Sequence, residues 1–150
     1  MVRRAVLASV TYDKTGLHPD MFAGPESGAS ADAPGRDLQL PFEQEYQALA
    51  PDPGHWPALL AKVQAMEMPE IAPEVISAID IPVLLIIGDS DIVTPEHAVA
   101  MFRLLGGGVL GDLAPMAAAR FAVLPGTSHI GVTGRADMLM TMIPPFLDAP

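Results

Sequence analysis

The stretch Ile81–Pro95, IPVLLIIGDSDIVTP, restricts the possible folds of this chain more than any other part of its sequence. Its apolar residues run almost without a break over Val83–Ile87, a pattern typical of a strand that is buried on both faces of a parallel sheet. Gly88 ends this run, and Thr94 with the following proline supplies a good N-cap and a good first residue for a helix. The stretch therefore predicts a strand, a polar loop and a helix, with the loop at the sheet edge where open α/β sheets place their chemistry.

Composition excludes several classes of function. The net charge of −10 argues against a surface for nucleic acid or for an anionic membrane, because both require clustered Lys and Arg. The absence of Cys excludes disulfides, thiol catalysis and Cys-ligated zinc. No apolar run approaches the length of a membrane span. The start, MVRRAVLASV, is better interpreted as a strand than as a signal peptide, because its apolar part is too short, and we expect a cytoplasmic protein.

Strand-like and helix-like patterns alternate along the chain, which predicts an α/β single domain over residues 1–150. Right-handed crossovers between successive strands would give a parallel sheet of about three strands with flanking helices. The predicted parts are a strand at Ala5–Val10 within residues 1–12, a loop at 13–40, a helical block at 41–79, and then, within 80–150, the central strand, a helix over 95–105, a strand over 120–124 and a helix from about 134 to 143 that Pro144 and Pro145 end.

Two of the predicted loops carry residues that are common in catalysis. Asp91 follows the central strand, and His129 follows the next strand along the chain. Because neighbouring parallel strands end at the same sheet edge, we expect the two side chains to meet there. An acid that orients a histidine and stabilises its imidazolium is two-thirds of a nucleophile–base–acid triad. Each residue alone has a simpler interpretation, since Asp91 could cap the following helix and His129 could be a loop histidine with a local hydrogen bond.

The segment IPVLLIIGDSDIVTPEHAVAMFRLL resembles the strand that delivers the triad acid in the α/β-hydrolase fold. The spacing Gly88-x-x-Asp91-x-x-x-Pro95 is similar to the motif of that family, which implies that Asp91 rather than Asp89 is the acid. The segment ARFAVLPGTSHIGV resembles the last strand and the loop that bears the triad histidine, which implies that role for His129.

The resemblance covers essentially the whole chain but only the C-terminal half of the family's domain. The segment MVRRAVLASVTYD resembles the strand that follows the helix of the nucleophile, and residues 41–79 would correspond to the helical lid of the family. With its neighbours in the sheet absent, the strand at Ala5–Val10 would expose an edge that pairs with another chain. We therefore expect a homo-oligomer or a separate partner chain.

The nucleophile of such a triad is missing from the sequence. The family places it in a G-x-S-x-G elbow between a strand and a helix. GPESG, at 24–28, has its serine in the wrong position, and GTSHI, at 126–130, lacks the closing glycine and is the histidine loop itself. An HGGG-type oxyanion loop is absent as well.

Other candidates receive lesser roles. We predict that Asp89 is a supporting or solvated carboxylate, that the Ser128 hydroxyl bonds local backbone, and that Trp56 packs in the helical block or lines a substrate pocket. Glu96 with His97, and His18 with Asp20, are metal-capable types, but neither pair gives three ligands at a convincing spacing. We therefore expect neither a metal nor a cofactor.

Three functions remain open. The first is part of a serine esterase, lipase or peptidase for a small ester or amide, inactive until another polypeptide or a longer chain supplies the elbow. The second is a non-catalytic oligomeric or interaction domain that is derived from a hydrolase. The third is a hydrolase with a relocated nucleophile or a directly attacking water, with His129 as the base. No nucleic-acid or membrane partner is expected under any of them.

Overall fold

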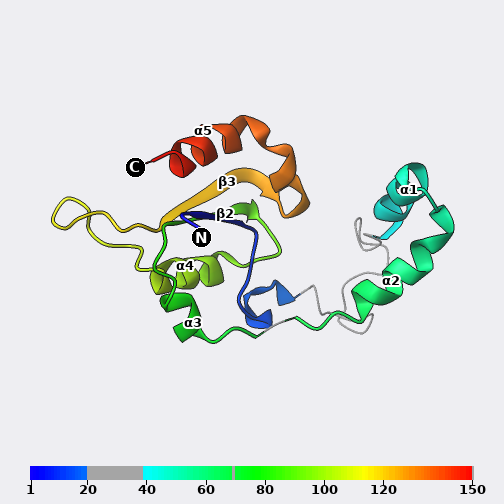
Figure 1. Ribbon diagram of the computed structural model, residues 1–150, viewed down its shortest axis with the longest axis horizontal. Helices are drawn as coiled ribbons and strands as arrows, with labels where there is room; N and C mark the ends of the chain where they lie inside the picture. Colours follow the sequence, from blue (N-terminus) through cyan, green and yellow to red (C-terminus); the bar gives the residue numbers. More distant parts are fainter. Residues whose placement is uncertain (20–38, 69, 150) are drawn as a thin grey trace. The chain divides into compact units, whose positions relative to one another are not determined.

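The computed structural model describes residues 1–19, 39–68 and 70–149 and has an α/β fold (Figure 1). The chain divides into two compact units. One, which we call the sheet unit, comprises Met1–Met21 and Pro69–Pro150. The other, the helical unit, comprises Phe22–Met68.

The sheet unit contains a three-stranded parallel sheet in the order β1-β2-β3, which confirms the predicted sheet. Its strands are β1 (Ala5–Ala8), β2 (Val83–Ser90) and β3 (Arg120–Ser128). The register places Leu7, Leu85 and Phe121 in one row across the sheet. The central strand contains the long apolar run of the sequence; β1 pairs with its first four residues and β3 pairs with it from Leu84 to Ser90.

Helices cover both faces of the sheet, as expected from the unbroken apolar pattern of β2 (Figure 1). On one face Val83 and Leu85 pack with Ile76 of α3 (Pro73–Ser77) and with α4 (Pro95–Leu104). On the other face Leu84 and Ile86 pack with α5 (Ala136–Leu147). These β2 side chains are no more than 5 % exposed, and full burial of each stabilises the fold by roughly 1.5–3 kcal/mol.

The helix α4 has the boundaries that its sequence predicts to within one residue. The Thr94 hydroxyl accepts a hydrogen bond from the His97 amide at 3.4 Å, and Pro95 occupies the first turn. The helix ends where Gly106 adopts a φ of 82° and the Gly107 amide donates to the Phe102 carbonyl at 2.8 Å. Local capping chemistry is therefore sufficient to define this element.

The predicted end of the last helix is wrong. The helix α5 continues to Leu147 although Pro144 and Pro145 lie inside it and cannot donate the amide hydrogen bonds of a regular helix. Phe146, in the turn that follows, packs in the same apolar cluster as Leu84, and the guanidinium of Arg4 lies 5.5 Å from its ring centroid. Tertiary packing of this last turn therefore outweighs the lost helical hydrogen bonds.

Two strand ends also differ from the prediction. The strand β1 stops at Ala8 rather than Val10, because Ser9 takes a positive φ of 52° that no strand accommodates. The strand β3 runs past Leu124 to Ser128, with an irregularity opposite the end of β2. Both differences lie at the carboxyl edge of the sheet.

Within the predicted loop at 13–40, residues 13–19 pack in the sheet unit, and residues 39–40 begin the first helix of the helical unit. Residues 13–19 contain a short 3-10 helix, η1 (Lys14–Gly16), and an antiparallel bridge between Leu17 and Val93. Leu17 is buried in a cluster with Ile87, Val93 and Ala98. Residues 20–38 of this predicted loop lie outside the described residues.

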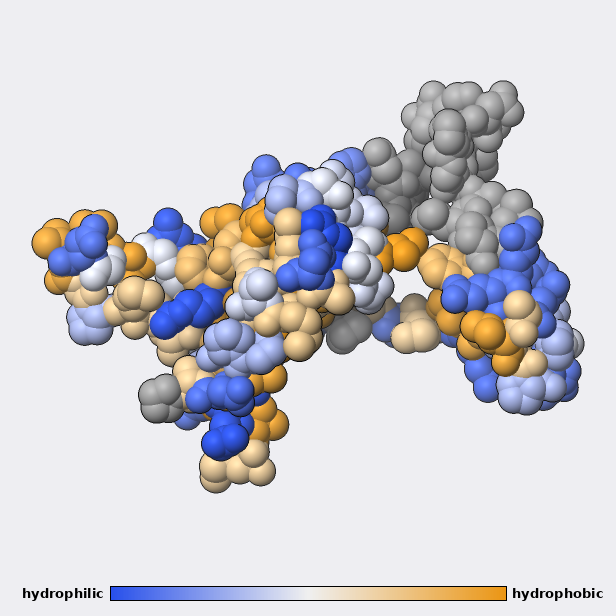
Figure 2. Space-filling model, turned by 90° about the horizontal axis from the view of Figure 1, so that it is seen from above, coloured by the Kyte–Doolittle hydropathy of each residue, from blue (hydrophilic) through white to orange (hydrophobic). Residues whose placement is uncertain are grey.

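The helical unit contains α1 (Gln39–Leu49), the 3-10 helix η3 (Pro53–His55) and α2 (Trp56–Gln64). The predicted helical block at 41–79 is thus divided, because α3 packs in the sheet unit through Ile76. The rings of Tyr46 and Trp56 lie 5.5 Å apart beside a hollow of about 500 Å³. Apolar and polar atoms lie side by side on the surface of the helical unit (Figure 2, right). Large apolar side chains exposed there are Phe42, Leu49, Leu59, Val63, Met66 and Met68.

Candidate active site

The structure brings Asp91 and His129 together at the carboxyl edge of the sheet. His129 Nδ1 lies 2.9 Å from Asp91 Oδ1, although the two residues are 38 positions apart in the sequence. The Asp91 side chain is fully buried, whereas that of His129 is 39 % exposed. A buried acid thus contacts Nδ1 of an imidazole whose side chain is partly exposed to solvent.

Asp91 accepts hydrogen bonds on both of its carboxylate oxygens. Oδ2 accepts from the Ser9 hydroxyl at 2.5 Å and from the Gly88 amide at 3.1 Å. Oδ1 accepts from the Val93 amide at 3.2 Å and from His129. Burial by itself would raise the pKa of Asp91, but these hydrogen bonds outweigh it and hold the pKa below its ordinary value.

An ionised Asp91 determines the tautomer of His129. A carboxylate can only accept, so the proton of a neutral imidazole is placed on Nδ1, and the lone pair is placed on Nε2. Among the residues that the structure describes, none is hydrogen-bonded to Nε2. The arrangement can therefore act as a general base toward a group that approaches from solvent.

Asp89 supports the loop that carries His129 and does not contact the histidine itself. Its Oδ2 accepts from the Gly126 amide at 2.8 Å, and its Oδ1 accepts from the Thr127 amide at 3.0 Å. These two backbone hydrogen bonds lower the pKa of Asp89. Asp89 therefore connects the end of β2 to the end of β3, a specific form of the supporting role that the sequence suggested.

Arg135 holds the same loop from its other side, and no sequence pattern pointed to it. Its Nη1 donates to the Pro125 carbonyl at 3.0 Å and to the Thr127 hydroxyl at 2.8 Å. Asp137 pairs with the guanidinium at 3.3 Å. Thr127 is almost completely buried between these groups, so the loop before His129 is fixed by charged side chains on both sides.

Close backbone packing at this edge requires glycine at position 88. A Cβ built on Gly88 would lie 1.9 Å from the carbonyl oxygen of Thr127. The glycine that ended the apolar run in the sequence therefore allows β2 and β3 to approach each other next to the Asp91–His129 pair.

The other candidates lie elsewhere or act locally. The Ser128 hydroxyl accepts from the Gly131 amide at 3.2 Å at the start of η4 (Ile130–Gly134), as its predicted local role requires. Trp56 packs on Tyr46 in the helical unit, and both residues line the hollow there. Within the described ranges, no serine hydroxyl is hydrogen-bonded to His129.

His97 is a buried structural histidine. Its ring stacks on Tyr12 with centroids 4.1 Å apart, and its Nε2 lies 2.9 Å from the Thr11 hydroxyl. Burial lowers the pKa of His97, and the nearby Asp13 offsets part of that effect. Over residues 1–19, 39–68 and 70–149 there is no cluster of three metal-ligating side chains and no helix long and apolar enough to cross a membrane.

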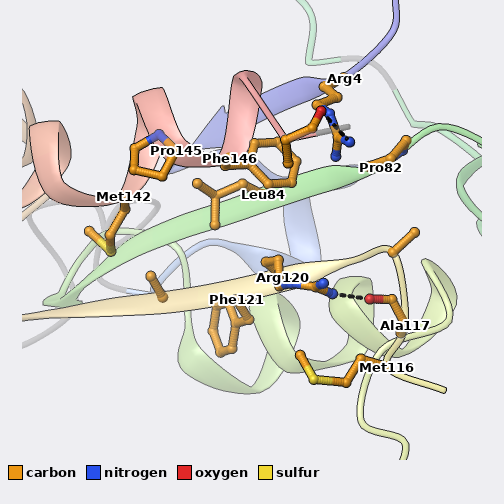
Figure 3. A pocket seen from close by; sticks show the side chains of 13 residues that line it. Arg4, Pro82, Leu84, Met116, Ala117, Arg120, Phe121, Met142, Pro145 and Phe146 are labelled. Carbon is orange, nitrogen blue, oxygen red and sulfur yellow. Dashed lines mark hydrogen bonds between the residues drawn. The ribbon is translucent and has the colours of Figure 1, made fainter. Parts of the chain in front are cut away.

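A cavity of about 600 Å³ lies at the opposite end of the sheet, where the strands begin (Figure 3). Arg4 precedes β1, Pro82 precedes β2, and Arg120 opens β3, and all three line it. Arg120 donates to the Ala117 carbonyl at its rim. The cavity is thus separated from the Asp91–His129 pair by the length of the strands.

Comparisons with known proteins found no protein that is similar to this chain. A scan against protein-family models found no match, and neither a search of curated proteins nor a search of solved structures found one.

Proposed function

We propose that this chain supplies the general base and the orienting acid of a serine-hydrolase site of the α/β-hydrolase type, for a small ester or amide. One observation carries the proposal: His129 Nδ1 lies 2.9 Å from the buried, ionised Asp91 at the ends of adjacent parallel strands. The chain order, acid before histidine, is that of the α/β-hydrolase triad.

Each half of the reaction would proceed by two proton transfers through His129. As a serine oxygen attacks the substrate carbonyl carbon, Nε2 takes the hydroxyl proton, and Asp91 stabilises the resulting imidazolium through Nδ1–H. The imidazolium then gives that proton to the leaving oxygen or nitrogen as the scissile bond breaks. Water repeats the sequence on the acyl-enzyme, which regenerates the serine and releases the acid.

The serine and its oxyanion hole would come from outside these 150 residues, because neither G-x-S-x-G nor an HGGG-type motif occurs within them. In this proposal the helical unit corresponds to the lid of that family, as the resemblance implies. The chain alone is therefore expected to lack turnover.

Intact-mass spectrometry after exposure to a fluorophosphonate, which labels activated serines, tests the proposal. We expect no adduct on the chain alone. When the chain is mixed with a polypeptide that carries the amino-terminal half of an α/β-hydrolase, including G-x-S-x-G, we expect one adduct on the serine of that partner. His129→Ala should abolish the adduct, and Ser77→Ala, which removes an exposed hydroxyl in α3, should leave it unchanged.

Two results would contradict the proposal. Labelling of the mixture that is undiminished in both His129→Ala and Asp91→Asn would show that the pair plays no part. Ester turnover by the chain alone that His129→Ala abolishes would indicate direct attack by water, or a serine of this chain, with His129 as its base.

A second candidate, an interaction domain, has its own support. The outer edge of β1 has no strand partner among the described residues, and this edge carries no proline, bulge or lysine. The connection before β3 also exposes large apolar side chains, Leu110 and Leu113, among polar ones (Figure 2, left). Sedimentation equilibrium tests it: a dimer that Ala8→Lys dissociates would favour it, and a monomer at all concentrations would oppose it.

A further inference from the structure

Ser9 has an unusual backbone conformation at the end of β1. Among the described residues it is the one non-glycine with a positive φ, at 52°. Its amide donates to the Ile86 carbonyl of β2 at 2.8 Å, which continues the strand pairing for one more residue. Its hydroxyl donates to Asp91 Oδ2 at 2.5 Å, across 82 positions of sequence.

Serine is a poor choice for this backbone conformation alone. An L-residue with a Cβ is disfavoured at positive φ, whereas glycine adopts it at no steric cost. Such a conformation persists when the surroundings over-determine it, and it is then a pointer to function. Here the surroundings are the amide bond to Ile86 on one side and the hydroxyl bond to Asp91 on the other.

The four donors to Asp91 are not equivalent. The Gly88 and Val93 amides lie three and two positions from Asp91, so they fix the carboxylate relative to its own loop. Ser9 directly follows β1 and its amide is bonded to β2, so its hydroxyl fixes the carboxylate relative to the sheet. The bond on Oδ2 leaves Oδ1 to accept from His129 Nδ1.

We propose that Ser9 is a positioning residue of this site, whose hydroxyl holds the Asp91 carboxylate in the orientation that keeps the His129 proton on Nδ1. The inference rests on the proposed function, to which it adds a residue at the carboxyl end of β1. Ser9, Asp91 and His129 then form a relay across the carboxyl ends of β1, β2 and β3, one residue from each strand end.

NMR of the Nδ1 proton of His129 tests this role without requiring turnover. We expect a separate low-field proton signal in the unaltered chain, assigned by its loss in His129→Gln. Ser9→Ala removes the hydroxyl, so the carboxylate gains freedom and the Nδ1 proton should exchange with water roughly tenfold faster, or broaden beyond detection. Ser77→Ala, in α3, removes an exposed hydroxyl that donates to the Pro73 carbonyl and should change nothing.

Two more variants separate the hydroxyl from the backbone conformation. Ser9→Gly suits the positive φ but lacks the hydroxyl, so it should fold at least as well as Ser9→Ala and still lose the protected proton. Ser9→Thr keeps the hydroxyl but strains the backbone, so it should keep the protected proton while unfolding at a lower temperature. If Ser9→Ala does not fold, Ser9→Gly decides the question.

A protected Nδ1 proton in folded Ser9→Gly, exchanging at the rate of the unaltered chain, would overturn the inference and leave Ser9 as a turn residue. This outcome is distinguishable from failure of the proposed function. Fluorophosphonate labelling of the completed site could then still depend on His129. Conversely, loss of the protected Nδ1 proton in Ser9→Gly would support the role of Ser9 even if no partner polypeptide restored fluorophosphonate labelling.

Discussion

The sheet unit and the helical unit bury their apolar side chains to different extents. In the sheet unit Ile86 is completely buried and Leu124 is 2 % exposed, whereas in the helical unit Leu49 and Met66 are each 75 % exposed. The sheet unit can therefore hold side chains at defined distances, because its core is packed on both faces of β2. The helical unit presents apolar surface of the kind that mediates contact with a ligand or another chain.

The polar groups at the candidate site are also well ordered by their hydrogen bonds. At the carboxyl edge of the sheet, every oxygen of Asp89 and Asp91 has a named donor. Within the described residues, no buried side-chain nitrogen or oxygen lacks a partner. The hydrogen-bonded carboxylates of the candidate site thus lie beside the densely packed core of the sheet unit.

Truncating one large apolar residue in each unit gives the largest expected contrast. Ile86→Ala removes a fully buried side chain from the cluster between the sheet and α5 and should lower the free energy of unfolding by about 3 kcal/mol. Leu49→Ala removes a mostly exposed side chain and should change it by less than about 0.5 kcal/mol. Urea unfolding followed by circular dichroism measures both, and similar losses in the two variants would show that the units do not differ in packing.

Adding one methyl group at the site should have the next largest effect. Gly88→Ala places a Cβ against the Thr127 carbonyl, and backbone atoms cannot move aside as a flexible side chain can. We expect a loss of about 2 kcal/mol in unfolding free energy, with displacement of the His129 loop. Gly134→Ala is the matched control, because nothing lies within 4 Å of its added Cβ, and equal thermal stability of the two variants would contradict the close approach of β2 and β3.

Acidification should destabilise the sheet unit in two stages. The change in unfolding free energy that each titrating residue causes should be smaller than the losses expected for Ile86→Ala and Gly88→Ala. The pKa of His97 is lowered from 6.5 in the fold by burial, so the unfolded chain takes up a proton first and stability falls as the pH drops below 6.5. The pKa of Asp91 is also lowered, from 3.8, so its contribution is complete above that pH and is lost as the pH falls through the folded value.

Thermal unfolding at a series of pH values measures both stages. His97→Gln removes the titrating ring and should flatten the stage that begins near pH 6.5, while the stage below pH 4 remains. Trp56, the single tryptophan, reports the helical unit by fluorescence at the same time. A first stage that persists in His97→Gln would assign it to a group other than His97.

Much of the fold could be predicted from local signals. The apolar run Val83–Ile87 indicated a strand that is buried on both faces, and the Thr94-Pro95 pair indicated the start of α4. The prediction failed at α5, where local rules stop a helix at Pro144-Pro145 but the packing of Phe146 continues it. It also missed Leu17, a single apolar residue in a glycine-rich and proline-rich stretch, which is buried through its bridge to Val93.

The sequence by itself determined the parallel α/β sheet, and it put an acid and a histidine at adjacent strand ends, because apolar periodicity and chain order act locally and in one dimension. Only the tertiary structure decided how that pair is held. Ser9 reaches Asp91 from 82 positions away, Asp89 binds the backbone before His129, and Arg135 closes the same loop. These contacts leave no pattern in the sequence, because each depends on a distance between segments that exists only after the sheet has formed.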